Sequence, residues 1–433
     1  MLLQAVEKKR GILRRFAECF TDHRDPSRVE HTVTQLASQR VLAIALGYED
    51  VNDHDRLRLD PLLTSVVEKI DPKGTSRKRP ADAGLALASP APLHRLELSH
   101  PGIAADNRYN RIGLNQGAVD DLLVDLFLEA YDEAPEEIVV DLDATDDPIH
   151  GNQDGRFFHG GHHRYCFLPL YIFVDGHLLC SRLRAADRDG ASGSLDELEH
   201  IVGRIRGSWP ETRIIVRGDS GFCRDWLMAW CEAQEAVDFV LGLAKNDRLF
   251  GRIAKDLDEV HTQSAGSGKP VRRFKELSYR TRSSWSGTRR VVAKVVHIPG
   301  RSNPRFVVTS LSTGSIDARE LYEDLYCARG DMENRIKEQQ LDLFADRTSC
   351  GLIRANQVRL YLSSLAYVLM SELRRIGLAG TELSKAQFGT IRTRLLKVGA
   401  RVRVTARRIW VSMSGSYPLQ DLLIQDWHRV ACS

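Results

Sequence analysis

The sequence lacks the features of a membrane-spanning, secreted or zinc-stabilised protein. No apolar run approaches the roughly 20 residues that a transmembrane helix needs. The N-terminal segment MLLQAVEKKRGILRRF has neither the cleavage site nor the sustained apolar core of a signal peptide. The eight cysteines form no CxxC pair and no disulfide-like spacing, and no internal repeat is present. These absences predict a cytosolic protein with reduced thiols, without structural zinc and without a membrane partner.

Basic residues, in contrast, are concentrated in two blocks. The 433 residues suffice for two or three domains, and the composition, 42% hydrophobic and 27% charged, is that of a globular protein. The net charge is only +3, yet ten Lys and Arg face one acid between Val271 and Arg305. Nine more face three acids between Gly377 and Ser433. Because the rest of the chain is acidic, the two blocks predict a polyanionic partner at defined surfaces.

Residues 1–70 predict a helical domain. A helical apolar repeat runs through the first twenty residues, and Asp25-Pro26-Ser27 supplies a cap and first turn for a second helix ending near Leu46. A third helical pattern covers Pro61–Ile70. Three short helices with basic residues are compatible with a DNA-binding helix-turn-helix and equally with a small bundle of other function. Residues 71–130 predict a linker, rich in Pro, Ser and Ala, followed by a connecting helix.

Residues 131–246 alternate between strand and helix patterns. A dipeptide typical of two-residue hairpins, Asp175-Gly176, joins two of the strands. The order strand, hairpin, helix, strand, helix, strand predicts a mixed α/β sheet. The expected strands are Glu137–Asp143, Tyr165–Val174, His177–Arg184, Thr212–Arg217 and Val237–Leu243, and the expected helices are Leu195–Arg206 and Asp225–Gln234.

The basic block falls in a second β-rich region, residues 247–315. Three runs there, FKELSYRT, RRVVAKVVHI and RFVVTSL, predict a small antiparallel sheet with a positive face. Residues 316–375 predict a polar helix and then a long apolar helix over Ala355–Leu373. The basic C-terminal region, residues 376–433, contains a hairpin pattern over Arg401–Val411.

A polar stripe marks the helix after the basic insertion. Tyr326, Arg329, Glu333 and Lys337 follow one another at steps of three, four and four, so a helix presents them on one face. A carboxylate beside two cations suits a metal ion bound next to phosphates. The same spacing also fits a solvated helix face with i,i+4 ion pairs.

Two further carboxylates stand at strand ends. Asp143 ends the strand in DLDATDD, where it shares a face with Asp141, and Asp219 ends the strand in VRGDSGF. Together with Glu333 these acids would repel one another unless a divalent cation lies among them, and Mg²⁺ prefers such oxygen ligands. Two ions suit phosphodiester chemistry. Taken singly, each Asp is equally a turn former or cap, and Asp146-Asp147-Pro148 predicts a turn cap.

Other residues are candidates for ligand contacts. The cluster His159-Gly160-Gly161-His162-His163 is compatible with a metal site, with a DNA or dimer contact, and with a plain loop. Trp285, in the polar segment SSWSG, is exposed by pattern and could stack on an unpaired base, or pack in a turn. The basic candidates for DNA contact in the insertion are Arg272, Arg273, Arg280, Arg282, Arg289 and Arg290.

The order DLDAT, GDSGF and YxxRxxxExxxK, with a β-rich insertion before the last, resembles the DDE transposases of bacterial insertion sequences. More closely, the chain resembles the insertion sequence 1380 family. The similarity covers almost the whole chain, including GYEDVNDHDRLR, HRYCFLPLYIF, SWSGTRRVVAK and ENRIKEQQLDLFADR. The resemblance implies an RNase H-like catalytic domain in which Asp143, Asp219 and Glu333 are the metal-binding, catalytic triad.

The polar stripe matches the signature that grips DNA phosphates in this wider group, which gives Tyr326, Arg329 and Lys337 a DNA-binding role. One departure concerns the lysine that the signature places seven residues after the glutamate, where this chain has Gln340. A glutamine can donate a hydrogen bond to a phosphate oxygen, but it adds no charge.

The resulting prediction is an α/β enzyme, a transposase that uses Mg²⁺ or Mn²⁺, with two ions, to cut and join phosphodiesters at insertion-sequence ends. The expected partners are double-stranded DNA, as terminal inverted repeats and target, and a second copy in a homodimer. The expected location is the bacterial cytoplasm, at the nucleoid. Two alternatives remain: a related metal-dependent nuclease or resolvase without strand transfer, and an inactive transposase-derived DNA-binding protein.

Overall fold

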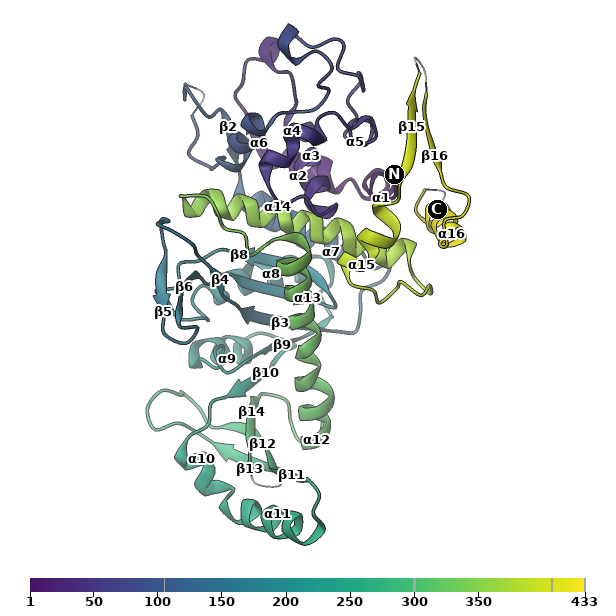
Figure 1. Cartoon of the computed structure of the whole chain (residues 1–433). Helices are drawn as coiled ribbons and strands as arrows, with labels where there is room; N and C mark the ends of the chain where they lie inside the picture. The colour runs from purple at the N-terminus through teal and green to yellow at the C-terminus, as the bar shows by residue number, and fades with distance from the viewer. Residues whose placement is uncertain (105, 299–300, 406–407, 432–433) are drawn as a thin grey trace.

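The computed structural model describes residues 1–104, 106–298, 301–405 and 408–431. Cys432, one of the predicted thiols, and residues 406–407 of the predicted C-terminal hairpin lie outside them. Figure 1 shows a helical part that contains the N-terminus, a sheet below it, and an elongated insertion at the far end. In the described part of the chain, no helix has the length and apolarity that crossing a membrane requires.

The α-helices are α1 (Leu2–Arg10), α2 (Ile12–Glu18), α3 (Val33–Ala45), α4 (His54–Leu57), α5 (Pro61–Val66), α6 (Pro90–Glu97), α7 (Gln116–Leu128), α8 (Ser194–Ser208), α9 (Asp225–Ala233), α10 (Asp247–Arg252), α11 (Ala254–Ser267), α12 (Ala318–Glu320), α13 (Gly330–Lys337), α14 (Ile353–Glu372), α15 (Phe388–Ile391) and α16 (Gln420–Ala431). The strands are β1 (Phe20–Asp22), β2 (Ile112–Leu114), β3 (Glu137–Ala144), β4 (Asp147–Pro148), β5 (Phe157–His159), β6 (Arg164–Phe167), β7 (Leu170–Val174), β8 (His177–Arg182), β9 (Arg213–Gly218), β10 (Val237–Leu243), β11 (Val271–Tyr279), β12 (Arg289–Ile298), β13 (Arg301–Ser302), β14 (Arg305–Thr309), β15 (Ala400–Val404) and β16 (Ile409–Met413).

The N-terminal part is helical, but two predicted helix bounds were wrong. The first helical run is interrupted at Gly11, which has a φ of 60° and separates α1 from α2. The cap of α3 is Thr32, which forms a capping box with Gln35. Asp25, the expected cap, accepts a hydrogen bond only within the 3₁₀ turn Pro26–Arg28. The chain is extended between this turn and α3, so the second helix starts later than predicted.

The segment predicted as a linker also contains a packed helix. In α6, Leu93 and Leu96 are fully buried, and α6 packs against α3 and α14. At this contact Glu97 accepts from Arg40 Nε at 3.0 Å and from Arg359 Nη1 of α14 at 3.2 Å. Glu97 is fully buried, so this three-residue ion-pair cluster joins the N-terminal helices to the helix that covers the sheet.

A nine-stranded mixed sheet forms the centre of the molecule. Its order is β11-β12-β14-β10-β9-β3-β7-β8, with β13 paired to β12. The central strands β10, β9 and β3 are parallel, and the outer pairs are antiparallel. The predicted hairpin turn is confirmed: Asp175 and Gly176 have φ values of 47° and 84°, so both lie in the left-handed region that this turn requires.

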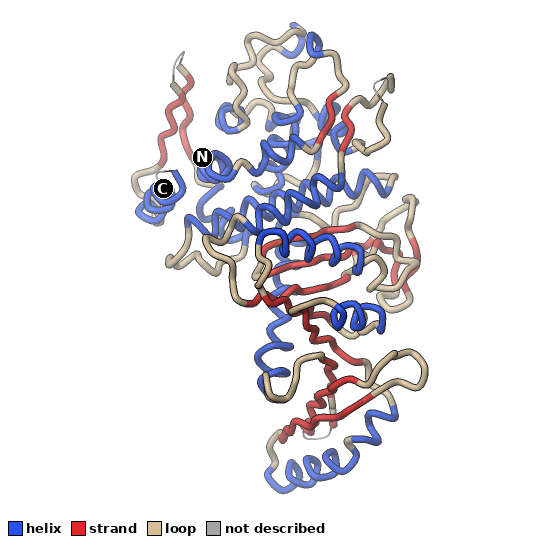
Figure 2. Tube along the Cα trace, turned by 180° about the vertical axis from the view of Figure 1, so that it is seen from behind, coloured by secondary structure: helices blue, strands red, loops and turns tan. Residues whose placement is uncertain are grey.

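Helices cover both faces of the sheet (Figures 1 and 2). On one face, α7, α8 and α9 bury side chains such as Leu198 and Met228 against apolar residues of β3, β9 and β10. On the other face, α14 and the N-terminal helices pack against β7 and β8, for example at Tyr367 and Phe173, whose ring centroids are 5.6 Å apart. The long apolar helix predicted near Ala355–Leu373 is therefore confirmed as α14, which lies between the sheet and the N-terminal helices.

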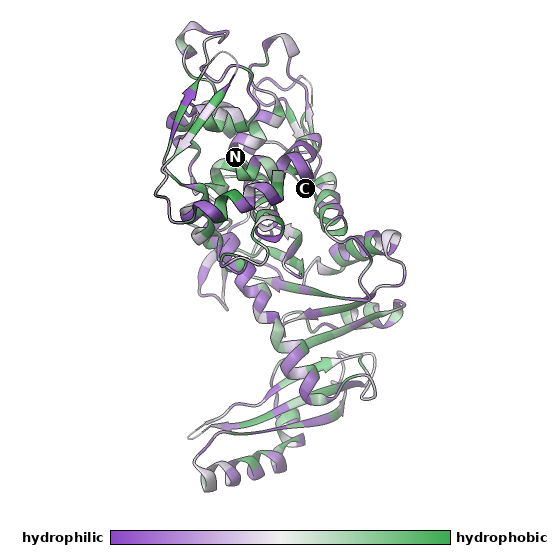
Figure 3. Cartoon of the chain, turned by 90° about the vertical axis from the view of Figure 1, so that its right-hand side faces the viewer, coloured by the Kyte–Doolittle hydropathy of each residue, from purple (hydrophilic) through white to green (hydrophobic). Residues whose placement is uncertain are grey.

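The β-rich insertion was predicted to form a separate small sheet, and this prediction was wrong. Strand β14 pairs with β10, so β14, β12 and β11 continue the central sheet outward. Helices α10 and α11 pack beside these strands, and Figure 3 shows that hydrophilic residues occupy much of α11. The sequence indicated the strands correctly. It could not indicate the pairing of Val240 with Thr309, because that pairing depends on the tertiary fold.

The predicted strand Tyr165–Val174 divides in two. β6 belongs to a small three-stranded sheet, β4-β6-β5, whereas β7 belongs to the central sheet. The break falls at Leu168-Pro169, where proline has no N–H to donate to a neighbouring strand. The predicted turn cap Asp147 is instead a fully buried residue of β4.

The polar stripe lies on an irregular helical segment, Ala318–Asp342, which is called the Glu helix below. It runs through α12, a π-helical turn (Leu321–Tyr326), a 3₁₀ turn (Cys327–Arg329), α13 and a second π-helical turn (Glu338–Asp342). In Figure 1 this segment crosses the sheet alongside β3, β9 and β10. The prediction of one regular α-helix was therefore only partly correct, because the number of residues per turn changes along this segment.

Candidate catalytic site

Two of the predicted acids are neighbours because β3 and β9 are parallel. Their register pairs Asp141 with Arg217 and Leu142 with Gly218. The next residue on each strand is an acid, Asp143 on β3 and Asp219 just after β9. A parallel register thus brings the two carboxylates to the same edge of the sheet, where α/β enzymes commonly bind ligands.

A buried ion pair next to these acids sets the position of the Glu helix. Arg217 donates to both oxygens of Asp141, at 2.5 and 2.7 Å, and both side chains are buried. The same guanidinium donates to the backbone carbonyl of Leu325. Asp141 therefore has a structural partner, whereas Asp143, on the same strand face, remains available at the edge.

Arg329 connects the third acid to the first. Its Nη1 lies 3.3 Å from Asp143 Oδ1, and its Nη2 donates to Glu333 Oε1. The Arg329 and Asp143 side chains are 18% and 16% exposed, whereas that of Glu333 is 42% exposed. One guanidinium thus draws the carboxylate of the Glu helix toward the strand end.

Asp143 lies in an unfavourable electrostatic environment for a carboxylate. Burial raises the pKa of Asp143 to about 6, Arg329 opposes the rise, and the carboxylates of Asp219 and Glu333 add to it. One cation therefore does not fully compensate three acids in this partly desolvated place. A group of carboxylates that repel one another in this way is typical of a functional site.

Tyr326 belongs to the same cluster. A Cβ placed on Gly242 of β10 would lie 2.6 Å from Tyr326 Oη and 3.2 Å from the backbone carbon of Asp219. Only glycine leaves room for this approach of the phenol to the strand. Burial raises the pKa of Tyr326, and the charge of Asp219 contributes to the increase. The phenol therefore faces the acid at the end of β9.

The structure separates the last two residues of the predicted signature. Lys337 is exposed, one helical turn beyond Glu333. Gln340 is half-buried, and its Nε2 donates to Asp147 Oδ1 at 3.0 Å. The spacing of the stripe indicated a shared face, but it gave no sign that the amide of Gln340 has a protein partner.

The donor chemistry of the three acids fits a hard divalent cation, because all their ligand atoms are carboxylate oxygens. In the structure, however, no group of three or more His, Cys, Asp and Glu side chains within residues 1–104, 106–298, 301–405 and 408–431 is arranged to hold a metal ion. At this site the guanidinium of Arg329 lies between the carboxylates of Asp143 and Glu333. Asp143, Asp219 and Glu333 are the residues that would hold the ion once Arg329 has moved.

Two of the six arginines predicted to contact DNA, Arg289 and Arg290, are engaged inside the insertion. Arg289 is 3% exposed and pairs with Asp225 at 2.7 Å and with Glu232 at 2.6 Å. Arg290 pairs with Glu276 at 2.6 Å and also donates to backbone carbonyls that follow β14. These two arginines therefore hold the insertion together, and their charges are compensated within the fold.

For Trp285 the exposure suggested by its pattern was wrong, and the alternative of packing in a turn is confirmed. Its residue is only 5% exposed, its ring packs edge-on against Tyr279 at 5.6 Å, and Arg289 lies 5.6 Å above it. The polar neighbours in SSWSG suggested an exposed loop, but the turn folds back onto α9 through Ser286 and Asp225. Burial leaves no indole face for a base to stack on.

Four of the six predicted DNA-contact arginines remain closer to solvent. Arg280 and Arg282 are exposed in the turn between β11 and β12, and Arg280 also donates to the carbonyl of Trp285. Arg272 is 53% exposed and pairs with Glu323 of the Glu helix at 2.7 Å. Arg273 pairs with Glu259 of α11. Arg280 and Arg282 are therefore the insertion residues best placed to contact DNA.

The histidine cluster lies in the β5–β6 turn. His162 Nδ1 is 3.4 Å from Asp146 Oδ1, and the backbone N–H of His162 donates to His159 Nδ1 at 3.3 Å. Among the described residues no group of three or more His, Cys, Asp and Glu side chains is placed here to hold a metal ion, which favours the loop interpretation.

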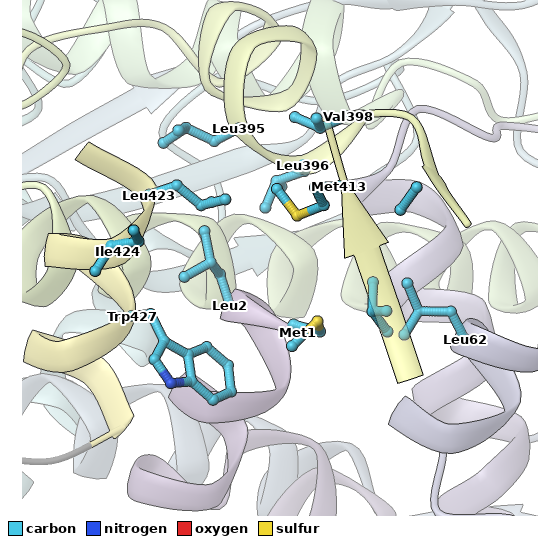
Figure 4. A pocket seen from close by; sticks show the side chains of 12 residues that line it. Met1, Leu2, Leu62, Leu395, Leu396, Val398, Met413, Leu423, Ile424 and Trp427 are labelled. Carbon is cyan, nitrogen blue, oxygen red and sulfur yellow. The ribbon is translucent and has the colours of Figure 1, made fainter. Parts of the chain in front are cut away.

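Two cavities lie away from the acids. An apolar cavity of about 260 Å³ is enclosed by α1, the β15–β16 hairpin and α16, where Trp427 and Leu2 line it (Figure 4). A polar cavity of about 860 Å³ lies beside the Glu helix, and its lining includes Asp141, Arg335 and Lys385. Neither cavity is lined by Asp143, Asp219 or Glu333.

Sequence reasoning missed Gly242, Asp147 and Tyr171. Gly242 interrupts an apolar strand, and a strand glycine is a sign of close backbone approach. Asp147 stands four residues after Asp143, but its place next to proline suggested a turn instead. Tyr171 faces Asp143 across β3 and β7, and this pairing is visible only in the sheet register.

No curated protein matches the chain. Among solved structures it is similar, at 12% identity and a TM-score of 0.42, to a chain in a cryo-EM structure of the piggyBac transposase synaptic complex with hairpin DNA, over 90% of this chain and 78% of that one. The family model of transposase DDE domains, group 1, matches residues 1–432. The chain therefore belongs to the family of group 1 transposase DDE domains.

Proposed function

We propose that this protein is a transposase of an insertion sequence of the 1380 family, and that it cuts and joins phosphodiesters at the ends of that element. The observation that carries the proposal is the meeting of Asp143, Asp219 and Glu333 from three separate segments, within a family defined by such acids. The sheet order β8-β7-β3-β9-β10, antiparallel and then parallel, supports an RNase H-like core.

In this proposal the three carboxylates hold two Mg²⁺ or Mn²⁺ ions. Bound ions of this kind activate an attacking oxygen and stabilise the leaving oxygen. Arg329, released from Asp143 and Glu333, is then free to hold a phosphate oxygen, as its planar guanidinium favours. Lys337 supplies a second positive charge from the same helix, and Tyr326 donates a hydrogen bond from beside Asp219.

The DNA partners follow from the distribution of exposed charge. Arg280 and Arg282 at the tip of the insertion would follow the DNA flanking the cut. The N-terminal helices and the basic hairpin β15–β16 would recognise the terminal inverted repeats. A homodimer would pair two element ends, and the protein would act at the nucleoid in the bacterial cytoplasm.

The test is cleavage of a labelled duplex that carries the element's own end, in the presence of Mg²⁺, by the wild type and by Asp219→Ala. A matched control is Asp187→Ala, because the Asp187 side chain is 40% exposed and pairs with its sequence neighbour Arg188. We expect a cut at the element boundary with the wild type and the control, and none with Asp219→Ala.

Further outcomes separate the alternatives. Cutting without joining of the freed 3′-hydroxyl to a target duplex would identify a nuclease or resolvase. If the wild type and Asp219→Ala bind the element end equally tightly and neither cuts it, the protein is an inactive DNA-binding descendant, and the proposal is contradicted.

A further inference from the structure

A buried polar contact joins the segment after Asp143 to the end of the Glu helix. Gln340 Nε2 donates to Asp147 Oδ1 at 3.0 Å, across 193 positions of sequence. Asp147 follows Asp143 by four residues, and Gln340 follows Glu333 by seven. The contact therefore connects the two elements that carry the first and third acids of the site.

Asp147 is not arranged as a charged group. It is fully buried, and its Oδ2 has no hydrogen-bond partner among the described residues. Burial raises the pKa of Asp147 well above its ordinary value, the bond from Gln340 opposes the rise, and the neighbouring acids Asp346 and Asp146 add to it. A carboxyl group in this position is held as the neutral acid, because an uncompensated buried charge costs far more than a shift in protonation.

The adjacent amide makes a second buried contact in another direction. Gln339 Nε2 donates to Ser364 Oγ of α14 at 2.9 Å, and Ser364 Oγ lies 2.8 Å from Ser181 Oγ of β8. Gln339 is fully buried. Consecutive amides thus fix the π-helical turn Glu338–Asp342 to α14 on one side and to β4 on the other, as expected of an anchor and not of a DNA-facing surface.

We propose that Asp147 and Gln340 are a pair of positioning residues that hold the Glu helix in register with β3, so that Glu333 meets Asp143 and Asp219. This inference deepens the proposed function and rests on it. It assigns Gln340 a role inside the protein, where the transposase signature places a lysine that contacts phosphate.

The variants Asp147→Asn, Asp147→Leu, Gln340→Ala and Gln340→Lys, made in the full chain, test the pair. The primary readout is Mn²⁺ affinity, measured from the electron paramagnetic resonance signal of free Mn²⁺, and cleavage of the labelled element end is the second. Asparagine keeps the acceptor oxygen and the shape of the neutral acid, so we expect Asp147→Asn to stay within about twofold of the wild type in both readouts.

Leucine at position 147 and alanine at position 340 each remove one partner. We expect each to weaken Mn²⁺ binding by about tenfold or more, as loss of a ligand-orienting contact does. The double variant Asp147→Leu/Gln340→Ala should be no weaker than the worse single variant, because the two residues act through one contact. Wild-type affinity in both single variants would overturn the proposal.

The substitution Gln340→Lys separates a positioning role from a phosphate contact. A new cation at a phosphate steepens the dependence of log K on log salt by about 0.9. We expect an unchanged salt slope for binding of the element end, and a steeper slope would overturn the proposal. A loss in Asp147→Asn as large as in Asp147→Leu would also overturn it, since it would show that a charged Asp147 is required.

These readouts distinguish failure of the inference from failure of the proposed function. If the wild type binds Mn²⁺ but cuts no DNA, the proposed function fails, while the Mn²⁺ affinities still decide the role of the pair. If the wild type cuts, and both disrupting variants bind Mn²⁺ and cut equally well, the positioning role alone is wrong. Asp147→Asn and Gln340→Lys keep the test decisive if the disrupting variants do not fold.

Discussion

Two regions of this chain are rich in charge, and the fold treats them in opposite ways. At the ends of β3 and β9, Arg329 pairs with both Asp143 and Glu333, and the pKa of Asp143 rises to about 6. In the insertion, Arg289 has two carboxylate partners and is 3% exposed. The first region keeps an uncompensated charge that a ligand can complete. The second uses its charge for folding, so local charge density by itself does not identify a binding surface.

The largest expected difference in end cleavage is between substitutions of Asp143 and of Asp141, which are two residues apart on the same face of β3. We expect Asp143→Asn to reduce end cleavage on the order of 10³-fold, as loss of one essential catalytic group does. Its thermal midpoint should stay equal or rise, since the substitution removes repulsion from Asp219 and Glu333.

Asp141→Asn is the matched control, because it disrupts the buried pair with Arg217. We expect it to lower the free energy of unfolding by about 3–5 kcal/mol. Equal cleavage loss without destabilisation in both variants would contradict the distinction between a structural and a catalytic aspartate.

The second prediction concerns the insertion. Arg289→Ala leaves Glu232 and Asp225 without their shared cation, and we expect it to lower the free energy of unfolding by about 3–5 kcal/mol. Denaturant unfolding measures this loss, with exposed Arg282→Ala as the control. A variant of unchanged stability that binds DNA less tightly would show that Arg289 contacts DNA after all.

The third prediction is the pH dependence of the metal-free protein. The pKa of Asp143 is about 6 in the folded state, above its ordinary value of 3.8, so the folded state retains a proton that the unfolded state releases between these values. The contribution of Asp143 therefore destabilises the fold as pH rises from about 4 to 6, on the order of 3 kcal/mol. Denaturant midpoints across this range should fall for the wild type relative to Asp143→Asn, and parallel curves would disprove the assignment.

The smallest effect on DNA binding is expected in the β11–β12 turn of the insertion. Arg280→Ala and Arg282→Ala should each reduce the salt slope of DNA binding by about 0.9 and leave stability within about 0.5 kcal/mol. Binding isotherms at several salt concentrations measure the slope, with Ser284→Ala in the same turn as control. Slopes equal to the wild type in both variants would exclude this turn from the DNA interface.

The central elements were predictable because their signals are local. The strand Val237–Leu243 has the predicted bounds, and α9 and α14 differ from prediction by only a few residues. The acids at the ends of β3 and β9 were recognisable because strand ends and helix spacing are properties of short segments. The two π-helical turns in the Glu helix were not, since α and π turns differ only slightly in local preference.

The pairing of distant residues was beyond sequence reasoning. Trp285 carries the pattern of an exposed loop, yet Tyr279 and Arg289 cover it. Gln340 resembles a DNA-facing position in the signature, yet its amide donates to Asp147. In both cases the partner lies outside the motif, and the motif by itself does not show which residues the fold brings into contact with it.

The sequence by itself determined most strands and helices, the two acids at strand ends, the glutamate of the helical stripe and the family signature, because these depend on residue type and short spacing. Only the tertiary structure decided which charges remain available for a ligand. The charge of Asp143 is only partly compensated by Arg329 because Asp219 and Glu333 also lie near, whereas Arg289 is neutralised because α9 packs its acids against β12. The physical reason is desolvation. Because a buried charge without a partner is costly, it is either paired within the fold or available to bind a ligand of opposite charge.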